Sequence, residues 1–325
     1  MTLLSPRQVA TALGVSESSL KRWVDAGRLV ATKTEGGHRK ISVAEALRFV
    51  RENNAPLARP ELLELPAGTT VSDAPSTTRG DAPSMTRGDA SIRTVDATTS
   101  EPELLSILLR GDATAARAWL LGRYLDGASI AELADGPIRT AMHALGELWR
   151  HDQAGIFVEH RGTDCCLQAV AHLRTLVEQS RDLRSVATDA RRTKRLPRVA
   201  VGGAPEDDPY VLPSFLAATV AASVGMRAVN LGPTTPVHAF EAAIVEHRPS
   251  LVWLSMSTPV SSTRIGELAA LVARVPTTTI VALGGRASTA VLNARVHGGY
   301  GAGLVRERTN VRACESMADL AALAK

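Results

Sequence analysis

The chain has few aromatic residues and no long apolar run. Aromatic residues make up 3% of its 325 residues, with four Trp and three Tyr. No apolar stretch reaches the ~18–20 residues that a membrane-spanning helix needs. The first residues, Met-Thr-Leu-Leu-Ser-Pro, also lack the basic and apolar regions of a signal peptide. These absences predict a cytoplasmic protein without a membrane partner.

Cysteine is scarce as well. The chain has three cysteines, and two of them, Cys165 and Cys166, are adjacent. This spacing suits neither a disulfide framework nor a zinc site. Cysteines buried in helices are usually unreactive, which disfavours covalent attachment of a chromophore at this pair. The length of the chain is enough for two or three domains, each with its own core.

The positive charge is concentrated near the start of the chain. Residues 1–54 carry nine Lys/Arg and five Asp/Glu, whereas residues 55–325 carry 28 of each. Because DNA is a polyanion, a basic excess confined to one small module indicates that this module contacts DNA.

Residues 1–54 have the pattern of two short helices and a hairpin. Ser5-Pro6 and Gly14 bound the first helix, and Ser16 and Gly27 bound the second. Two short helices joined by a tight glycine turn predict a helix-turn-helix. In that motif the early residues of the second helix face the major groove. Here they are Glu17, Ser18, Lys21 and Arg22.

Two extended runs around Gly36-Gly37 predict the hairpin, with basic side chains on its returning arm. The run from Gly36 to Ile41 resembles the winged helix of MerR-type regulators. The resemblance implies that Arg39 and Lys40 contact phosphate or the minor groove, and such contacts position a protein on DNA. His38 belongs to the same wing. The expected DNA-binding residues are Ser18, Lys21, Arg22, His38, Arg39 and Lys40.

The next two segments differ in composition. Residues 55–100 are rich in Pro, Ser and Thr, and they contain a tandem octapeptide at 73–80 and 81–88. This predicts a disordered tether that lets DNA-binding heads reach sites of varied spacing. Between 101 and 185 apolar residues recur at helical spacing in four segments with short connections, which predicts a four-helix bundle.

From residue 196 to 325, predicted strands and helices alternate. This alternation predicts an α/β doubly wound, Rossmann-like domain with a parallel sheet. Ligands of such sheets bind at the carboxyl ends of the strands. The fold class is therefore multidomain, with a winged helix-turn-helix, a four-helix bundle and a Rossmann-like domain.

The Rossmann-like segment resembles cobalamin-binding domains. Asp208–Pro213, Ser255-Met-Ser257 after 41 residues and Gly284-Gly285 after 26 more match the spacing of D-x-H-x-x-G, S-x-L and G-G. Trp149 is followed, with nine residues between, by Glu159-His160. This spacing resembles the helical cap of the CarH/LitR photoreceptor regulators, and the resemblance covers nearly all of the chain outside residues 55–100.

The resemblance implies adenosylcobalamin as the ligand. Trp149 would lie against its upper face, with Glu159 and His160 near the adenosyl group. Asp208 would hold the residue that ligates cobalt. The slot for the nucleotide tail would be lined by Ser255, Ser257, Gly284 and Gly285.

Three departures from the family pattern bear on how cobalt would be ligated. Tyr210 stands at the position of the cobalt-ligating His, and Pro213 replaces the glycine that should follow. Light-sensing members have a His where this chain has Arg150, so any light response should lack an endpoint with two His ligands. A tyrosinate is disfavoured by its ordinary pKa of about 10 and by the nearby Asp208, so no metal ligand is assigned. The alternatives are cobalamin without protein ligation, another planar molecule such as a bilin, or no ligand.

These features predict a DNA-binding transcription regulator rather than an enzyme. Its sensor would control homo-oligomerisation, as a dimer or tetramer, and operator binding in response to a tetrapyrrole-type ligand and light. One alternative is a ligand-independent regulator or antagonist that acts through protein association. Another is a cobalamin-dependent methyltransferase or mutase module, but no substrate-activating domain accompanies it.

Overall fold

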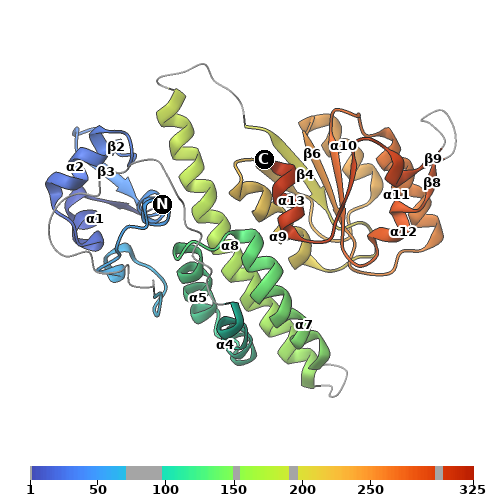
Figure 1. Ribbon diagram of the computed structural model, residues 1–325, viewed down its shortest axis with the longest axis horizontal. Helices are drawn as coiled ribbons and strands as arrows, with labels where there is room; N and C mark the ends of the chain where they lie inside the picture. The colour runs from blue at the N-terminus through green and yellow to red at the C-terminus, as the bar shows by residue number, and fades with distance from the viewer. Residues whose placement is uncertain (1, 71–96, 149–153, 190–196, 297–302) are drawn as a thin grey trace. The chain divides into compact units, whose positions relative to one another are not determined.

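A computed structural model describes residues 2–70, 97–148, 154–189, 197–296 and 303–325. Two compact units can be distinguished, one formed by residues 1–129 and 136–192 and the other by residues 130–135 and 193–325. The first unit holds the amino-terminal domain and the long helices, and the second holds the parallel sheet (Figure 1).

The amino-terminal domain is a winged helix-turn-helix, as predicted. It comprises β1 (Leu3–Leu4), α1 (Pro6–Leu13), α2 (Glu17–Asp25), β2 (Thr32–Lys33), β3 (Arg39–Ser42) and α3 (Val43–Asn53). Local hydrogen bonds define its helix ends. Ser5 and Gln8 form a reciprocal capping box at the start of α1, and Gly14 ends the helix with a φ of 67°. The Ser16 side chain accepts from the Ser19 amide at the start of α2.

Part of the segment expected as a tether has described structure. A short 3-10 helix, η1 (Pro60–Leu63), follows α3, and the Leu63 side chain is fully buried. The Arg59 amide donates to the Ala12 carbonyl at 3.0 Å, which joins this segment to α1. Residues 71–96, with both octapeptides, lie outside the described residues.

Four long helices pack side by side in the first unit (Figure 1). They are α4 (Ala97–Arg110), α5 (Ala113–Leu125), α7 (Arg139–Leu148) and α8 (Ala154–Asp189). Between α5 and α7, the short α6 (Ile130–Leu133) runs into a π-helical turn, Ala134–Ile138, that contains Pro137. Residues 130–135 belong to the second unit, although they come between two helices of the bundle.

The second unit is a doubly wound parallel sheet with strand order β10-β7-β6-β4-β5. Its strands are β4 (Val199–Gly203), β5 (Arg227–Asn230), β6 (Leu251–Ser255), β7 (Ile280–Gly284) and β10 (Val311–Cys314). Helices α9 (Val211–Ser223) and α13 (Met317–Ala324) pack on one face. The other face is covered by α10 (Val237–His247), α11 (Ser262–Arg274) and α12 (Ser288–Leu292) (Figure 1).

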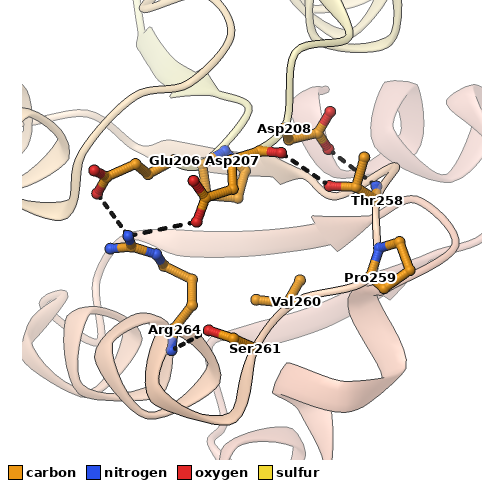
Figure 2. A pocket seen from close by; sticks show the side chains of 9 residues that line it. Glu206, Asp207, Asp208, Thr258, Pro259, Val260, Ser261 and Arg264 are labelled. Atoms are coloured by element: carbon orange, nitrogen blue, oxygen red, sulfur yellow. Dashed lines mark hydrogen bonds and ion pairs between the residues drawn. The ribbon is translucent and has the colours of Figure 1, made fainter.

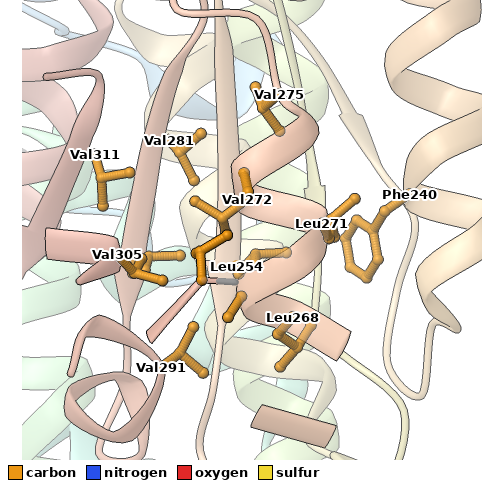
Figure 3. Packing of buried hydrophobic residues seen from close by; sticks show 14 of the residues in the cluster. Phe240, Leu254, Leu268, Leu271, Val272, Val275, Val281, Val291, Val305 and Val311 are labelled. Atoms are coloured by element: carbon orange, nitrogen blue, oxygen red, sulfur yellow. The ribbon is translucent and has the colours of Figure 1, made fainter. Parts of the chain in front are cut away.

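The buried cluster between the sheet and α11 is built from aliphatic side chains. Leu254 and Val281 of the sheet lie in one buried cluster with Leu268 and Val272 of α11 and with Phe240 of α10 (Figure 3). β5 lies on one side of β4 and β6 on the other, so the order in which strands are added reverses between β4 and β6, and the loops after these two parallel strands meet at the carboxyl edge of the sheet. In doubly wound folds this switch point is where ligands bind.

Candidate functional site

The expected DNA-reading residues lie on the surface of the winged helix. Ser18, Lys21 and Arg22 are exposed on α2, while Leu20 on the opposite side of the helix is fully buried. His38 is exposed at the tip of the wing, and Arg39 and Lys40 are half-buried on β3. These side chains are accessible to a partner, and their contact with DNA stays a prediction.

Arg39 also has an internal partner. Its Nη1 lies 2.7 Å from Oδ1 of Asp25, the last residue of α2, and 40% of its side chain is exposed. This ion pair joins the wing to the end of α2. Since a guanidinium has five donors, Arg39 can hold the wing and still offer hydrogen bonds outward.

A buried ion pair that the sequence analysis missed supports the same surface. The Glu45 side chain is fully buried and accepts from the Val30 amide at 2.8 Å and from Arg48 Nε at 2.8 Å. Arg48 Nη2 in turn donates to the Arg28 carbonyl at 2.8 Å. Glu45 and Arg48 thus fix the connection between α2 and the wing. Their i, i+3 spacing on a helix was visible in the sequence, but their burial was not.

In the bundle, Glu159 and His160 lie near the start of α8. Glu159 accepts from Thr163 Oγ1 at 3.1 Å and lies 3.4 Å from His160 Nε2. The His160 side chain is 77% exposed, whereas that of Glu159 is 22% exposed. Trp149 and Arg150 lie outside the described residues.

Large apolar side chains are exposed beside this pair. Ile156 is 47% exposed and Phe157 is 65% exposed, both in the first turn of α8, and Leu148 at the end of α7 is 39% exposed. The Arg161 guanidinium lies 5.0 Å from the centre of the Phe157 ring. Sequence reasoning assigned Phe157 only to a helix, because exposure depends on tertiary packing.

Cys165 and Cys166 are buried in the middle of α8. Burial raises the pKa of the Cys166 thiol to about 12. Since the thiolate is the reactive form, this pair is poorly suited to covalent attachment of a chromophore.

In the sheet unit, Asp208 joins the two loops at the switch point. Its side chain is 2% exposed. Oδ2 accepts from the amides of Ser257 and Thr258 in the loop after β6, and Oδ1 accepts from the Tyr210 amide at 3.1 Å. Figure 2 shows Asp208 facing Thr258. The carboxylate is therefore bonded to backbone amides, and Tyr210, at the start of α9, is 47% exposed.

The space around the double glycine is occupied by the chain itself. Gly285 has a φ of 93°, and a Cβ added there would lie 2.2 Å from the Met256 carbonyl oxygen. On β4, a Cβ at Gly202 would lie 2.2 Å from the Trp253 side chain, which is 2% exposed. Gly202 and Gly285 therefore both permit close packing within the sheet unit.

A chain of polar contacts fills the sheet face below Ser255. Trp253 Nε1 donates to Ser214 Oγ at 3.2 Å, and Ser214 Oγ donates to Asn230 Oδ1 at 2.7 Å. Ser255 itself is 8% exposed. Trp253 Nε1, Ser214 Oγ and Asn230 Oδ1, from β6, α9 and β5, thus have partners within the protein.

The hollow at the switch point is small. It has a volume of about 20 Å³, which is room for about one water molecule. Arg264 lies on its wall, 2.8 Å from Glu206 and 3.7 Å from Asp207 (Figure 2). No group of three His, Cys, Asp or Glu side chains suited to a metal ion occurs among the described residues. The hollow itself is therefore too small for the nucleotide tail of cobalamin, and Tyr210 offers no imidazole for cobalt.

Comparison with known families identifies two domains. Residues 3–54 match the family model of a helix-turn-helix domain, and residues 101–174 match that of a B12 binding domain. The chain carries a helix-turn-helix domain and a B12 binding domain. The combination predicted from the sequence is thus confirmed, with the B12 match on the helical segment. A comparison with curated proteins found no match.

Solved structures give weaker likenesses. The Methanosarcina barkeri monomethylamine corrinoid protein is 14% identical, with 68% of this chain and 95% of that chain covered and a TM-score of 0.46. The M. barkeri methanol:cobalamin methyltransferase complex MtaBC is 15% identical, with coverages of 74% and 87% and a TM-score of 0.32. A cobalamin-binding protein from Desulfitobacterium hafniense DCB-2 is 17% identical, with coverages of 58% and 78% and a TM-score of 0.28. These values are too low to assign a function.

The helices were also compared with the requirements of a membrane span. None of those within the described residues combines the length and the hydrophobicity needed to cross a bilayer.

Proposed function

We propose that this protein is a transcription regulator whose winged helix binds operator DNA and whose B12 binding domain binds a corrinoid. The observation that carries the proposal is the presence of both domains in one chain, with Lys21 and Arg22 exposed on α2. An enzyme module would not need a DNA-reading head, so we propose a regulator rather than a methyltransferase.

The charge distribution supports DNA binding by the head. The excess of Lys/Arg over Asp/Glu lies in residues 1–54, and α2 presents its cations to solvent on the face that helix-turn-helix proteins insert in the major groove. Wing residues Arg39 and Lys40 would contact the backbone and set the register of the head.

The exposed apolar end of the bundle supports corrinoid binding by the helical domain. Leu148, Ile156 and Phe157 present apolar surface, and Trp149 directly follows Leu148 in the sequence. The flat face of a corrin ring would bury these side chains, with Glu159 and His160 as polar neighbours. Because the sheet unit offers Tyr210 instead of His, we propose that the protein does not ligate cobalt from below.

Ligand binding would then control whether the protein associates with itself as a dimer or tetramer. Joining several heads raises the effective DNA concentration for each head once one is bound, so assembly alone can switch operator occupancy. Illumination would act by changing the bound corrinoid. Because Arg150 replaces the expected His, the illuminated form would lack two His ligands.

A UV–visible spectrum of the purified full chain tests this proposal. The protein is mixed in darkness with adenosylcobalamin, hydroxocobalamin or biliverdin, passed through a gel-filtration column, and measured before and after illumination. We expect corrinoid absorbance to remain with the protein and the eluted mass to depend on it. Retention of biliverdin alone would identify a bilin sensor instead.

The contact surface is tested by substitution. Phe157→Ala should weaken corrinoid affinity about tenfold or more, because a buried Phe side chain contributes roughly 1.5–3 kcal/mol. Val245→Ala removes another exposed apolar side chain, from α10, where it is 75% exposed, and should leave affinity unchanged. Equal effects of the two substitutions would argue against the bundle surface.

A second candidate is a ligand-independent regulator that acts through protein association. The filled interior of the sheet unit, where Trp253, Ser214 and Asn230 satisfy one another, favours this candidate. Loss of every chromophore on the column, together with DNA affinity that none of them changes, would support it over corrinoid sensing.

A further inference from the structure

The carboxyl end of α3, in the winged helix, contacts the carboxyl end of α5, in the helical domain. Arg51 of α3 donates from Nη1 to the carbonyls of Tyr124 and Ala128, the latter at 2.7 Å. Its Nη2 donates to the Gly127 carbonyl at 3.2 Å. The guanidinium also lies 4.0 Å from the centre of the Tyr124 ring.

This geometry suits both partners of the contact. The last carbonyls of a helix have no partner within the helix and carry partial negative charge. The planar, always charged guanidinium of Arg51 donates to one carbonyl in the last turn of α5 and to two in the turn that follows, and it stacks on an aromatic ring at the same time. Burial raises the pKa of the Tyr124 hydroxyl, as expected for a ring covered by neighbouring groups.

A second contact holds the same two parts together. A Cβ added at Gly122, on α5, would lie 2.4 Å from the Thr70 carbonyl oxygen. The chain that leaves the winged helix through η1 therefore passes directly over α5, at a position that carries no side chain. Arg51 and Thr70 belong to different segments of the amino-terminal part, and both lie against the carboxyl end of α5 and the turn after it.

We propose that these four residues, Arg51, Tyr124, Gly122 and Thr70, form a latch that fixes the orientation of the DNA-binding head on the B12 binding domain. The latch uses α3 and the segment after η1, and it leaves Lys21 and Arg22 exposed on α2. It therefore orients the DNA-reading surface without covering it. A latched DNA-binding head moves with the helical domain. When several copies of the protein associate, the spacing between their heads is therefore defined.

The latch itself stands independently of any ligand, and its effect on operator spacing rests on the proposed function. A head held only by a tether would tolerate sites of varied spacing, because a flexible linker samples many separations. A latched head would restrict binding to operators whose half-site spacing matches the assembly. The latch is thus proposed as the determinant of operator spacing.

Hydrogen exchange of the full chain, without DNA or ligand, tests the latch. Arg51→Ala should speed exchange about tenfold at the amides of residues 126–128, because it removes charge-assisted bonds to their helix end. Gly122→Ala alters the contact on the side of the helical domain. Its added methyl group should displace the Thr70 carbonyl and speed exchange at the same amides. Unchanged exchange at residues 126–128 in both variants would overturn the proposal.

Matched controls separate the latch from general destabilisation. Arg123→Ala removes an Arg that stacks on Trp119 within α5 itself, at 5.3 Å. Gly146→Ala adds a methyl group on α7 where no atom lies within 4 Å. Neither control should alter exchange at residues 126–128. If the controls match the test variants, the change reflects loosening of the bundle and the latch is rejected.

DNA binding gives the functional readout. Arg51→Ala should keep the affinity for a single half-site and should flatten the dependence of affinity on the spacing between two half-sites. Retained spacing dependence in a variant whose exchange has changed would reject the role in spacing. If the unsubstituted protein fails to bind any DNA, the proposed function fails, while the exchange experiment still decides whether the latch exists.

Discussion

Asp208 occupies the aspartate position of the cobalamin-binding spacing, and its side chain accepts hydrogen bonds from backbone amides. The sequence analysis expected it to hold a cobalt ligand, but its two oxygens accept from three backbone amides at the switch point. A carboxylate so placed ties the loop after β4 to the loop after β6. The sequence placed Asp208 between the first strand of the sheet and its helix, whereas its partners depend on the loop after β6, some 50 residues away.

His172, on α8, should make the stability of the helical domain depend on pH. Its Nε2 is buried without a hydrogen-bond partner among the described residues. Burial, with a smaller effect of Arg117, lowers its pKa from the ordinary 6.5. The folded protein therefore keeps His172 neutral when the unfolded chain already binds a proton, so stability is full above pH 6.5 and falls as the pH drops below it.

We expect the melting temperature to fall between about pH 7.5 and about pH 5.5, and His172→Gln to reduce that fall. The matched control is His143→Gln, because His143 is exposed on α7. Thermal unfolding followed by circular dichroism at several pH values gives the measurement. A pH profile that His143→Gln changes as much as His172→Gln does would contradict the assignment.

At the level of elements, helix ends with local partners were the most predictable features. Ser5, Gly14 and Ser16 were assigned from sequence, and each sits at the expected helix end because its partners lie within four residues. The start of α13 has a local capping box, formed by Ser316 and Asp319, and a distant partner as well. Its Met317 and Ala318 amides donate to Asp135, 182 and 183 residues earlier in the chain, and no local pattern reveals such a pairing.

Asp135→Ala should loosen α13 in the sheet unit. The substitution removes both acceptors from the first turn of the helix, which lie 2.8 and 2.9 Å from the two amides. We expect a loss of about 1–2 kcal/mol in the free energy of unfolding, the usual range for a helix cap. Asp135→Asn keeps one acceptor oxygen and should lose less. Urea unfolding measures both, and equal stability of all three proteins would show that Asp135 does not cap α13.

For the whole molecule, the sequence predicted which domains are present and their order, because each has its own periodicity and turn residues. It placed the winged helix, the helical segment and the parallel sheet correctly. It did not predict that residues 130–135 join the sheet unit, or that Thr70 lies against α5. Both depend on contacts between segments that are distant in sequence and carry no periodic signal.

The uneven charge of the chain should govern its salt dependence on DNA. Affinity for DNA falls as the salt concentration rises, so the slope of log affinity against log salt is negative. Removing one cation that binds a phosphate should reduce the magnitude of this slope by about one. Lys21→Ala, in the exposed face of α2, should have this effect in the full chain. Arg295→Ala removes an exposed cation from the sheet unit and should leave the slope unchanged. Fluorescence anisotropy with labelled DNA at several salt concentrations provides the measurement, and a slope whose magnitude both substitutions reduce equally would refute DNA binding by the head alone.

The close approach of Gly285 to Met256 has a consequence for how such proteins are recognised in genomes. The packing of two neighbouring strand ends requires a glycine at position 285, whether or not the sheet unit binds a ligand. A protein without the ligand would therefore still need this glycine, whereas packing makes no such demand at the position of the histidine, where Tyr210 is 47% exposed. Sequence searches that give the double glycine and the histidine equal weight would therefore group proteins that differ in the ligand they bind.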